Sequence, residues 1–372
     1  MRVVASLVPN AELHGWRSEP LLSVSGLSVD YGAGPEATHA VREVDLVIGK
    51  GEVVGLAGES GSGKTTLVYA ATRLLRSPAR VTGGSVRYFG PEGEAVEVLS
   101  VPERRLREIR WAEVAIVFQS AMNALNPVID IGTQLTDAVI AHRGRMEQEE
   151  RVARARELLE IVGIDRSRVR SFPHELSGGQ RQRVMIAMAL ALEPRLIIMD
   201  EPTTALDVVT QRQILEEVSA LRERFGFSIL FVTHDLSLLI ELADRIAVMY
   251  GGRIVEEGPA EQIYRAPGHP YTLGLLSSFP PLHGRRSRLV GIPGSPPDLR
   301  GELIGCMFAP RCSFAFGTCH SEDPPLEEVS AGRWVACHLH GRAEGLPVAL
   351  ASSVAPGVTP LWVAVLAARR RL

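Results

Sequence analysis

The chain has 372 residues and a mass of 40.4 kDa, more than a single domain usually needs, which indicates one principal domain with an appendage or two domains. Hydrophobic residues make up 45% and charged residues 22% of the sequence, which excludes a wholly disordered or low-complexity protein. The net charge of −3 disfavours a nucleic-acid-binding protein, and the longest late apolar run, residues 361–368, is too short for a membrane-spanning helix.

The first two thirds of the chain predict strands of two kinds. We expect residues 1–20 to be a flexible leader. Polar residues interrupt its apolar stretch, so it does not resemble a signal peptide. Three segments alternate apolar and polar residues as half-buried strands do: 22–24, 27–29 and 41–48. Four runs are nearly continuously apolar: 53–57, 114–118, 196–199 and 229–232. Such runs are typical of strands buried on both faces of a parallel sheet, so we expect an α/β fold.

Helical and irregular segments separate or follow these runs. Within residues 152–162, the apolar positions fall on one face of a helix, which predicts an inserted helical subdomain at about residues 120–180. Residues 246–255 predict a hairpin that turns at Gly251 and Gly252. The Pro/Gly-rich stretch 291–297 predicts a linker before a region that holds all four cysteines.

Residues 58–65 carry the sharpest motif of the sequence. They read GESGSGKT, which fits G-x-x-x-x-G-K-[ST], and they directly follow the predicted strand 53–57. Glycines let successive backbone N–H groups curl around phosphate oxygens, and the next helix offers its positive end. In such a loop, Lys64 contacts the β- and γ-phosphates and the Thr65 hydroxyl coordinates Mg²⁺. The alternative, a glycine-rich turn without a ligand, is disfavoured by the strand before it.

Two acidic residues end the apolar run 196–199. Asp200 can hold Mg²⁺, directly or through water, and Glu201 can polarise the attacking water. An apolar strand often ends in an exposed Asp without any such role. The preceding phosphate loop favours the catalytic interpretation, because parallel strands bring their carboxyl ends together.

The segment LSGGQ at residues 176–180 precedes an apolar helical pattern. Ser177 and the glycines can cap that helix and leave its first N–H groups for an anion, and a plain helix cap is the alternative. With this segment, the chain resembles the ATP-binding subunits of ABC transporters. The resemblance implies a P-loop ATPase core with an antiparallel β subdomain and a helical subdomain, in which the LSGGQ segment closes over ATP bound by a second subunit.

Further residues match that family in the expected order. Tyr31 matches an aromatic residue that stacks on adenine, Gln119 a glutamine that contacts the metal and γ-phosphate, and His234 a switch histidine at the γ-phosphate. The segment 205–207, Ala-Leu-Asp, matches one that contacts the opposite subunit. Each of these residues taken alone has an ordinary structural explanation, such as a polar strand end.

The resemblance implies a hydrolysing site. The expected catalytic residues are Lys64, Gln119, Glu201 and His234. The expected nucleotide contacts are Tyr31, Gly58, Ser60, Gly61, Ser62, Gly63, Lys64, Thr65, Thr66, Gln119, Ser177, Gly179, Gln180, Asp200 and His234. The expected Mg²⁺ ligands are Thr65, Gln119 and Asp200.

Within the family, the likeness is to the ATPases of peptide/nickel-type importers. It is carried by Asn126-Pro127, residues 202–207, residues 269–272 (HPYT) and residues 292–297 (IPGSPP). The domain organisation then predicted is a leader at 1–20, an ABC ATPase domain at 21–265, and a C-terminal domain at 266–340. Residues 341–372 form a tail that is disordered, packs against protein or touches a membrane surface.

The four cysteines, Cys306, Cys312, Cys319 and Cys337, all lie in the C-terminal region with spacings C-x5-C-x6-C-x17-C. Four thiolates suit either tetrahedral zinc or a four-iron cluster. Zinc sites favour tight C-x2–4-C pairs, which are missing here, so a [4Fe-4S] cluster is the favoured interpretation; the resemblance to peptide-importer ATPases implies the same. Zinc and unligated thiols are the alternatives.

The expected function is therefore that of the ATP-hydrolysing motor of an ABC importer, with ATP and Mg²⁺ as cofactors, for di- or oligopeptides. The partners implied are a second ATPase subunit, two membrane permeases and, indirectly, an extracytoplasmic solute-binding protein. The chain would act at the cytoplasmic face of the cell membrane. Alternatives are an importer of nickel or another small solute, and a soluble ABC ATPase that acts on ribosomes or nucleic acid, which the acidic balance disfavours.

Overall fold

A computed structural model describes residues 19–118, 124–204, 206–278 and 291–340 of the chain. Most of the predicted leader, the predicted tail 341–372, Gln119 and Ala205 lie outside these residues. Within them, no helix combines the length and apolar character needed to cross a membrane.

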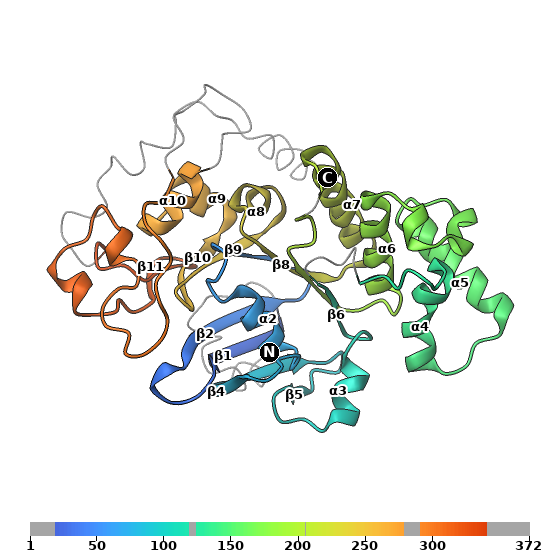
Figure 1. The fold of residues 1–372 in the computed structure, drawn as a ribbon, viewed down its shortest axis with the longest axis horizontal. Coiled ribbons are helices and arrows are strands. Elements are labelled where there is room, and N and C mark those ends of the chain that lie inside the picture. Colours follow the sequence, from blue (N-terminus) through green and yellow to red (C-terminus); the bar gives the residue numbers. More distant parts are fainter. Residues whose placement is uncertain (1–18, 119–123, 205, 279–290, 341–372) are drawn as a thin grey trace.

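An eight-stranded sheet forms the centre of the structure, in the order β11-β12-β10-β9-β3-β8-β7-β6 (Figure 1). Its parallel part consists of β3 (Val53–Ala57), β6 (Val114–Val117), β7 (Leu196–Asp200), β8 (Ser228–Thr233) and β9 (Arg245–Tyr250). Its antiparallel part consists of β10 (Arg253–Pro259), β11 (Glu327–Ser330) and β12 (Arg333–Val335). The four predicted buried strands are thus confirmed to within one residue at each end. The predicted hairpin 246–255 is confirmed as β9–β10 with its turn at Gly251 and Gly252, but β10 continues four residues farther than predicted, to Pro259.

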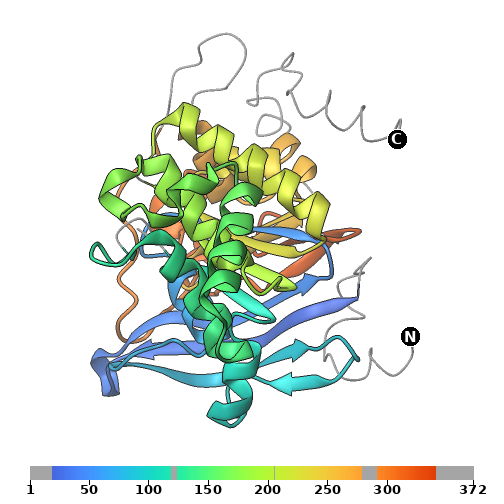
Figure 2. The ribbon, with the colours of Figure 1, turned by 90° about the vertical axis from the view of Figure 1, so that its right-hand side faces the viewer.

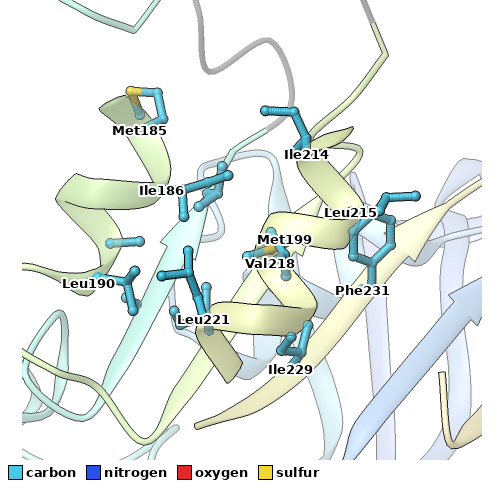
Figure 3. Close-up of a cluster of buried hydrophobic side chains, with 14 of the residues drawn as sticks. Met185, Ile186, Leu190, Met199, Ile214, Leu215, Val218, Leu221, Ile229 and Phe231 are labelled. Atoms are coloured by element: carbon cyan, nitrogen blue, oxygen red, sulfur yellow. The ribbon is translucent and has the colours of Figure 1, made fainter. Parts of the chain in front are cut away.

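Both faces of the parallel strands are covered, which explains their continuous apolar sequences. Alternate residues of one strand belong to different cores: Val53 and Ala57 face the helical side, and Val54 and Leu56 face the other. On the helical side, α6 and α7 contribute to one core with the strands, where Met199 lies beside Val218 and Phe231 beside Leu215 (Figure 3). Every residue of β3, β7, β8 and β9 is buried.

A second, four-stranded antiparallel sheet covers the other side, in the order β2-β1-β4-β5 (Figures 1 and 2). It consists of β1 (Pro20–Tyr31), β2 (Thr38–Gly49), β4 (Ala79–Phe89) and β5 (Ala95–Glu97). Residues 22–24 and 27–29 belong to the one strand β1, whose register against β4 shifts between Ser25 and Ser28. A side chain on Gly84 would come within 2.5 Å of the Gly26 carbonyl oxygen, so this irregular crossing requires glycine.

The helices connect the strands and surround the main sheet. They are α2 (Lys64–Ala71), α3 (Glu103–Ile109), α4 (Ile131–Arg143), α5 (Gln148–Ile161), α6 (Gly178–Leu190), α7 (Val208–Phe225), α8 (Leu236–Leu242), α9 (Ala260–Arg265) and α10 (Pro270–Ser278). Short 3-10 turns are η1 (Gly34–Glu36), η3 (Arg166–Arg170), η4 (Pro173–Glu175), η5 (Ala309–Arg311) and η6 (Gly317–His320). Helices α4 and α5 project at the right of Figure 1, and α5 buries Ala155, Leu158 and Leu159 as its sequence pattern predicts.

The cysteine-bearing segment packs at the opposite end of the main sheet from α4 and α5 (Figure 1). Strand β12 pairs with β10, and β11 pairs with β12, so this segment continues the same sheet. Asp323 accepts hydrogen bonds from Arg42 of β2 at 3.1 Å and from Arg253 of β10 at 2.6 Å. The segment is therefore attached by both backbone pairing and partly buried side-chain contacts.

Candidate nucleotide-binding and hydrolysis site

The loop of residues 58–63 connects β3 to α2 at the carboxyl end of the parallel strands. A Cβ on Gly58 would lie 2.2 Å from the Met249 carbonyl oxygen, and one on Gly63 would lie 2.3 Å from that of Ala40. Gly63 also has a φ of +104°, in the region that favours glycine. The loop can thus follow its tight path only with glycine at these two positions, and α2 begins directly after it, with its free N–H groups at this end.

Lys64 is the first residue of α2, and its ammonium group is folded back onto the loop. It donates hydrogen bonds to the carbonyl oxygens of Gly58 at 2.7 Å and Glu59 at 2.9 Å. Burial lowers its pKa, and the charges of Glu201, Asp200 and Glu59 oppose this shift. The positive charge of Lys64 is thus held inside the loop and interacts electrostatically with these three carboxylates.

Asp200 and Thr65 fit a divalent metal. Thr65 donates a hydrogen bond from Oγ1 to Oδ1 of Asp200 at 3.2 Å. Asp200 is completely buried, and its Oδ2 has no hydrogen-bond partner among the described residues. A buried carboxylate oxygen without a donor is costly unless a cation binds it, and oxygen ligands are those that Mg²⁺ prefers. Burial raises the pKa of Asp200, which the hydrogen bond from Thr65 partly offsets.

Glu201 is positioned by its backbone and by two side chains. Its amide donates to the Val232 carbonyl oxygen at 2.9 Å, and its φ of +46° is unusual for a residue other than glycine. Oε1 lies 3.2 Å from Nδ1 of His234, and Oε2 accepts a hydrogen bond from the Thr204 hydroxyl at 3.0 Å. The structure thus brings Glu201 and His234 together, as expected. Thr204 was missed by the sequence reasoning, although it lies three residues after Glu201.

Tyr31 lies beside the start of α2. Its hydroxyl group is 3.2 Å from Oγ1 of Thr66, and its side chain is exposed at the end of β1. An exposed ring next to the phosphate loop is available for stacking on a base. This contact is consistent with the expected position of Tyr31 near the nucleotide.

The LSGGQ segment caps α6. The Ser177 hydroxyl accepts a hydrogen bond from the Gln180 amide at 3.2 Å, and the Gln180 side chain accepts one from the Ser177 amide at 3.0 Å. Gly179 lies against α7, where an added Cβ would meet the Thr210 side chain at 2.9 Å. In the described part of the chain, Ser177 and Gln180 bond to each other and not to the phosphate loop.

Two other predicted features, Gln119 and the segment 205–207, lie wholly or partly outside the described residues. Gln119 lies outside the described residues, directly after Phe118, whose ring packs edge-on against Tyr69 of α2. Of the segment 205–207, Asp207 caps α7 by accepting a hydrogen bond from the Thr210 amide at 2.9 Å. The second subunit that this segment is expected to contact would have to approach the exposed side of that cap.

Tyr271 touches the phosphate loop from the C-terminal region. Its hydroxyl oxygen accepts a hydrogen bond from the Glu59 amide at 2.7 Å, and its side chain is fully buried. In the sequence, the HPYT segment indicates only the subfamily and predicts no contact of Tyr271 with the phosphate loop. A buried tyrosine outside the core motifs was the available signal, but its partner lies 212 residues away.

The four cysteines are free thiols, each partly buried. The Cys306 amide donates a hydrogen bond to the Cys319 carbonyl oxygen at 2.8 Å, which places these two residues side by side. Burial raises the pKa of Cys306 to about 11 and that of Cys337 to about 12. Among the described residues, no three Cys, His, Asp or Glu side chains are grouped closely enough to hold one metal ion, so the expected cluster and its zinc alternative gain no support here.

Comparison with protein families identifies both parts of the chain. Residues 41–204 match the family described as "ABC transporter", and residues 255–319 match "Oligopeptide/dipeptide transporter, C-terminal region". The first match spans the phosphate loop, the LSGGQ segment, Asp200 and Glu201. The second spans the HPYT segment and three of the four cysteines.

Individual relatives agree with these matches. A Brucella melitensis protein named as a peptide import ATP-binding protein is 44% identical over 328 residues, which cover 86% of this chain and 97% of the relative. A Sinorhizobium fredii protein named as a peptide ABC transporter ATP-binding protein is 42% identical over 325 residues, covering 86% and 95%.

Solved structures with the same fold include an ATP-binding cassette, captured as a dimer in a post-hydrolysis state with ADP and phosphate. It is 32% identical, with a TM-score of 0.56, and the match covers 64% of this chain and 99% of the cassette. A second dimeric structure, described as a bacterial ABC transporter cassette, gives a TM-score of 0.57 at the same identity and coverage. The chain therefore belongs to the ATP-binding proteins of the ABC transporter family, in the group that carries the oligopeptide/dipeptide transporter C-terminal region.

Proposed function

We propose that this chain is the ATP-hydrolysing motor subunit of an importer for di- or oligopeptides. The observation that carries the ATPase role is the convergence of Lys64, Asp200 and Glu201 at one end of the parallel sheet. The peptide substrate class is supported by the C-terminal region and by the printed names of the relatives.

In the proposed reaction, the chain's residues bind, orient and move a proton. ATP would take the Lys64 ammonium group from the loop carbonyls and pair it with the β- and γ-phosphates. Mg²⁺ would be held by the Thr65 hydroxyl and Asp200, with Gln119 as a further ligand, and would neutralise phosphate charge. Glu201 would accept a proton from the water that attacks the γ-phosphorus, giving ADP and phosphate, while His234 holds the γ-phosphate.

The site is proposed to be completed by a second ATPase subunit. Ser177, Gly179 and Gln180 form a cap that does not reach the phosphate loop of its own chain. We place them over the nucleotide of the partner, as the dimeric relatives suggest. Closure and opening of this dimer would drive two permeases at the cytoplasmic face of the membrane, supplied by an extracytoplasmic solute-binding protein.

Two substitutions test the hydrolysis mechanism. Lys64→Ala should abolish tight MgATP binding, whereas Glu201→Gln should retain MgATP and lower turnover by about 10²-fold or more, because only the proton acceptor is lost. Turnover and bound nucleotide are measured in the assembled complex. Glu261→Gln, the same exchange in an exposed ion pair with Arg265 on α9, is the control and should leave turnover unchanged. Near-normal turnover of Glu201→Gln would contradict the assignment.

Substrate class requires a transport measurement. Cells that lack this gene should lose uptake of a labelled dipeptide or oligopeptide, and the wild-type gene, but not Glu201→Gln, should restore it. Uptake of labelled Ni²⁺ in the same cells tests the alternative cargo. Loss of nickel uptake with unchanged peptide uptake would overturn the proposal on cargo while leaving the ATPase role intact.

We also propose that the four cysteines bind a [4Fe-4S] cluster with a structural role. The spacing supports it, as does the proximity of Cys306 and Cys319; a four-iron cluster needs its ligands farther apart than one metal ion does. Such a cluster would supply folding free energy to a short segment. Anaerobic purification should give about four irons and four sulfides per chain. Stoichiometric zinc without iron, or no metal at all, would refute it.

A further inference from the structure

A bidentate ion pair joins the phosphate loop to the segment between two of the cysteines. Nη1 of Arg311 donates a hydrogen bond to Oε2 of Glu59 at 2.7 Å, and Nη2 donates to Oε1 at 3.0 Å. Glu59 is the second residue of the phosphate loop, and Arg311 lies in η5, directly before Cys312. Two residues 252 positions apart thus form a planar, forked contact, the strongest kind of side-chain pair.

Arg311 is fixed in place by the C-terminal region and the main sheet. Its Nε donates to the Pro293 carbonyl oxygen at 2.7 Å, and its Nη1 also lies 3.3 Å from the Tyr250 hydroxyl. The residue is only 7% exposed, and its pairing with Glu59 raises its pKa, so the charge persists at any physiological pH. A buried guanidinium that cannot lose its proton requires a fixed anion, and Glu59 is that anion.

The same region supports the Glu59 backbone. The Tyr271 hydroxyl accepts from its amide, and Lys64 donates to its carbonyl oxygen. Phe308, from the same cysteine segment as Arg311, packs against Tyr250 and Tyr271 with ring centroids 5.2 and 5.4 Å apart. The amide, the carbonyl oxygen and the carboxylate of Glu59 are therefore all hydrogen-bonded. Two of the partners, Tyr271 and Arg311, lie outside the ABC core.

The charge of Glu59 explains why this arrangement matters. A carboxylate in the phosphate loop would repel the phosphates of ATP if it turned toward them, and the charge of Glu59 already acts on Lys64. We propose that Arg311 is a positioning residue for ATP binding. It neutralises Glu59, turns its carboxylate away from the phosphates, and holds the loop in its binding conformation from the C-terminal region.

The test is a double-mutant cycle on MgATP binding to the full-length chain, followed with a fluorescent ATP analogue. Arg311→Ala should raise the Kd by about tenfold, a size in the usual range for contacting residues. Arg311→Ala combined with Glu59→Gln removes the uncompensated charge as well, and should return the Kd to within about threefold of wild type. A Kd for Arg311→Ala within twofold of wild type would overturn the proposal, as would a double variant that binds no better than the single one.

A matched control distinguishes positioning of the phosphate loop by Arg311 from a general role of Arg311 in attaching the C-terminal region to the sheet. Asp323→Asn weakens the contacts with Arg42 and Arg253, which attach the same segment to the sheet without touching the phosphate loop. It should lower the thermal unfolding temperature and leave the Kd for MgATP unchanged. An equal loss of affinity in Asp323→Asn and Arg311→Ala would show that Arg311 acts only through attachment, and would overturn the proposal.

Arg311→Lys keeps the proposal testable should Arg311→Ala fail to fold. Lysine retains the positive charge but loses the fork, so the Kd should lie between those of wild type and Arg311→Ala, about threefold above wild type. Wild-type affinity in Arg311→Lys would refute positioning by the bidentate contact. The inference rests on ATP binding by this site, and its failure would leave the effects of Lys64→Ala and Glu201→Gln unchanged.

Discussion

Asp200 combines complete burial with one oxygen that lacks a donor among the described residues, and this combination would make the proposed binding of Mg²⁺ sensitive to protons. Thr65 offers Asp200 one hydrogen bond, which stabilises the carboxylate only in part. Desolvation dominates and raises the pKa of Asp200. A proton therefore competes with Mg²⁺ for this residue at higher pH than it would for an exposed aspartate.

The resulting prediction is a pH dependence. As pH falls from neutrality toward the raised pKa of Asp200, protonation should remove the metal ligand, so Mg²⁺-dependent nucleotide binding should weaken. As pH rises again, binding should recover. Protonation of the nucleotide changes the binding affinity of wild type and of Asp200→Asn equally. The difference between the pH dependences of their nucleotide affinities therefore reports the protonation of Asp200 alone. Parallel pH profiles of the two proteins would contradict the prediction.

At the scale of elements, Arg245 joins four separate strands or turns. From the start of β9, it bonds Glu52 before β3 at 2.9 and 3.1 Å, and it also bonds Glu257 of β10 and the Val47 carbonyl of β2. Arg245 is 8% exposed and Glu257 is 2% exposed. Removing the arginine would leave the buried carboxylate of Glu257 and the partly buried carboxylate of Glu52 without this counter-charge.

Arg245→Ala should accordingly lower the free energy of unfolding by about 3–5 kcal/mol, the usual cost of breaking a buried pair. The control is Arg212→Ala on α7, whose ion pairs with Glu216 and Glu241 are both long at 3.7 Å and whose side chain is exposed to solvent. That variant should change stability by about 0–1 kcal/mol. Denaturant unfolding measures both. Equal, small effects of the two substitutions would show that the buried network adds nothing to stability.

The elements that the sequence predicted well are those whose burial leaves a local pattern. Strands covered on both faces appear as continuous apolar runs, and a cap such as Ser177 with Gln180 appears as a short motif. Strand β4 gave no such signal, because Gly83 and Gly84 interrupt it where it crosses β1. Contacts between distant segments, such as Glu59 with Arg311, depend on the folded chain and leave no trace in either segment alone.

At the scale of the whole molecule, Asp200 bonds Thr65 of the phosphate-loop motif, whereas Ser177 and Gln180 bond each other within the LSGGQ segment. We therefore predict that hydrolysis requires two ATPase subunits. Specific activity of the purified chain should fall upon dilution, because dissociation removes the Ser177 cap from each nucleotide. The solved relatives that are dimers support this expectation.

An add-back experiment sharpens the dilution test. Excess Lys64→Ala chains, which keep an intact Ser177, should restore part of the activity of dilute wild-type chains. Chains with both Lys64→Ala and Ser177→Arg should restore none. Activity that is independent of concentration, with no effect of either added chain, would show that a single subunit suffices.

The pairing of β12 with β10 also determines which backbone N–H and C=O groups of the main sheet lack a neighbouring strand. Without the C-terminal region, β10 would be an edge strand with a free row of N–H and C=O groups beside apolar Ile254 and Val255, a template for strand addition between molecules. The outer strand of the complete sheet is instead the short β11, which presents exposed Glu327 and Glu328. A chain truncated after residue 265 should thus aggregate in light-scattering measurements, while the full chain should stay dispersed. The C-terminal region would then prevent self-association of the sheet in addition to contacting the phosphate loop.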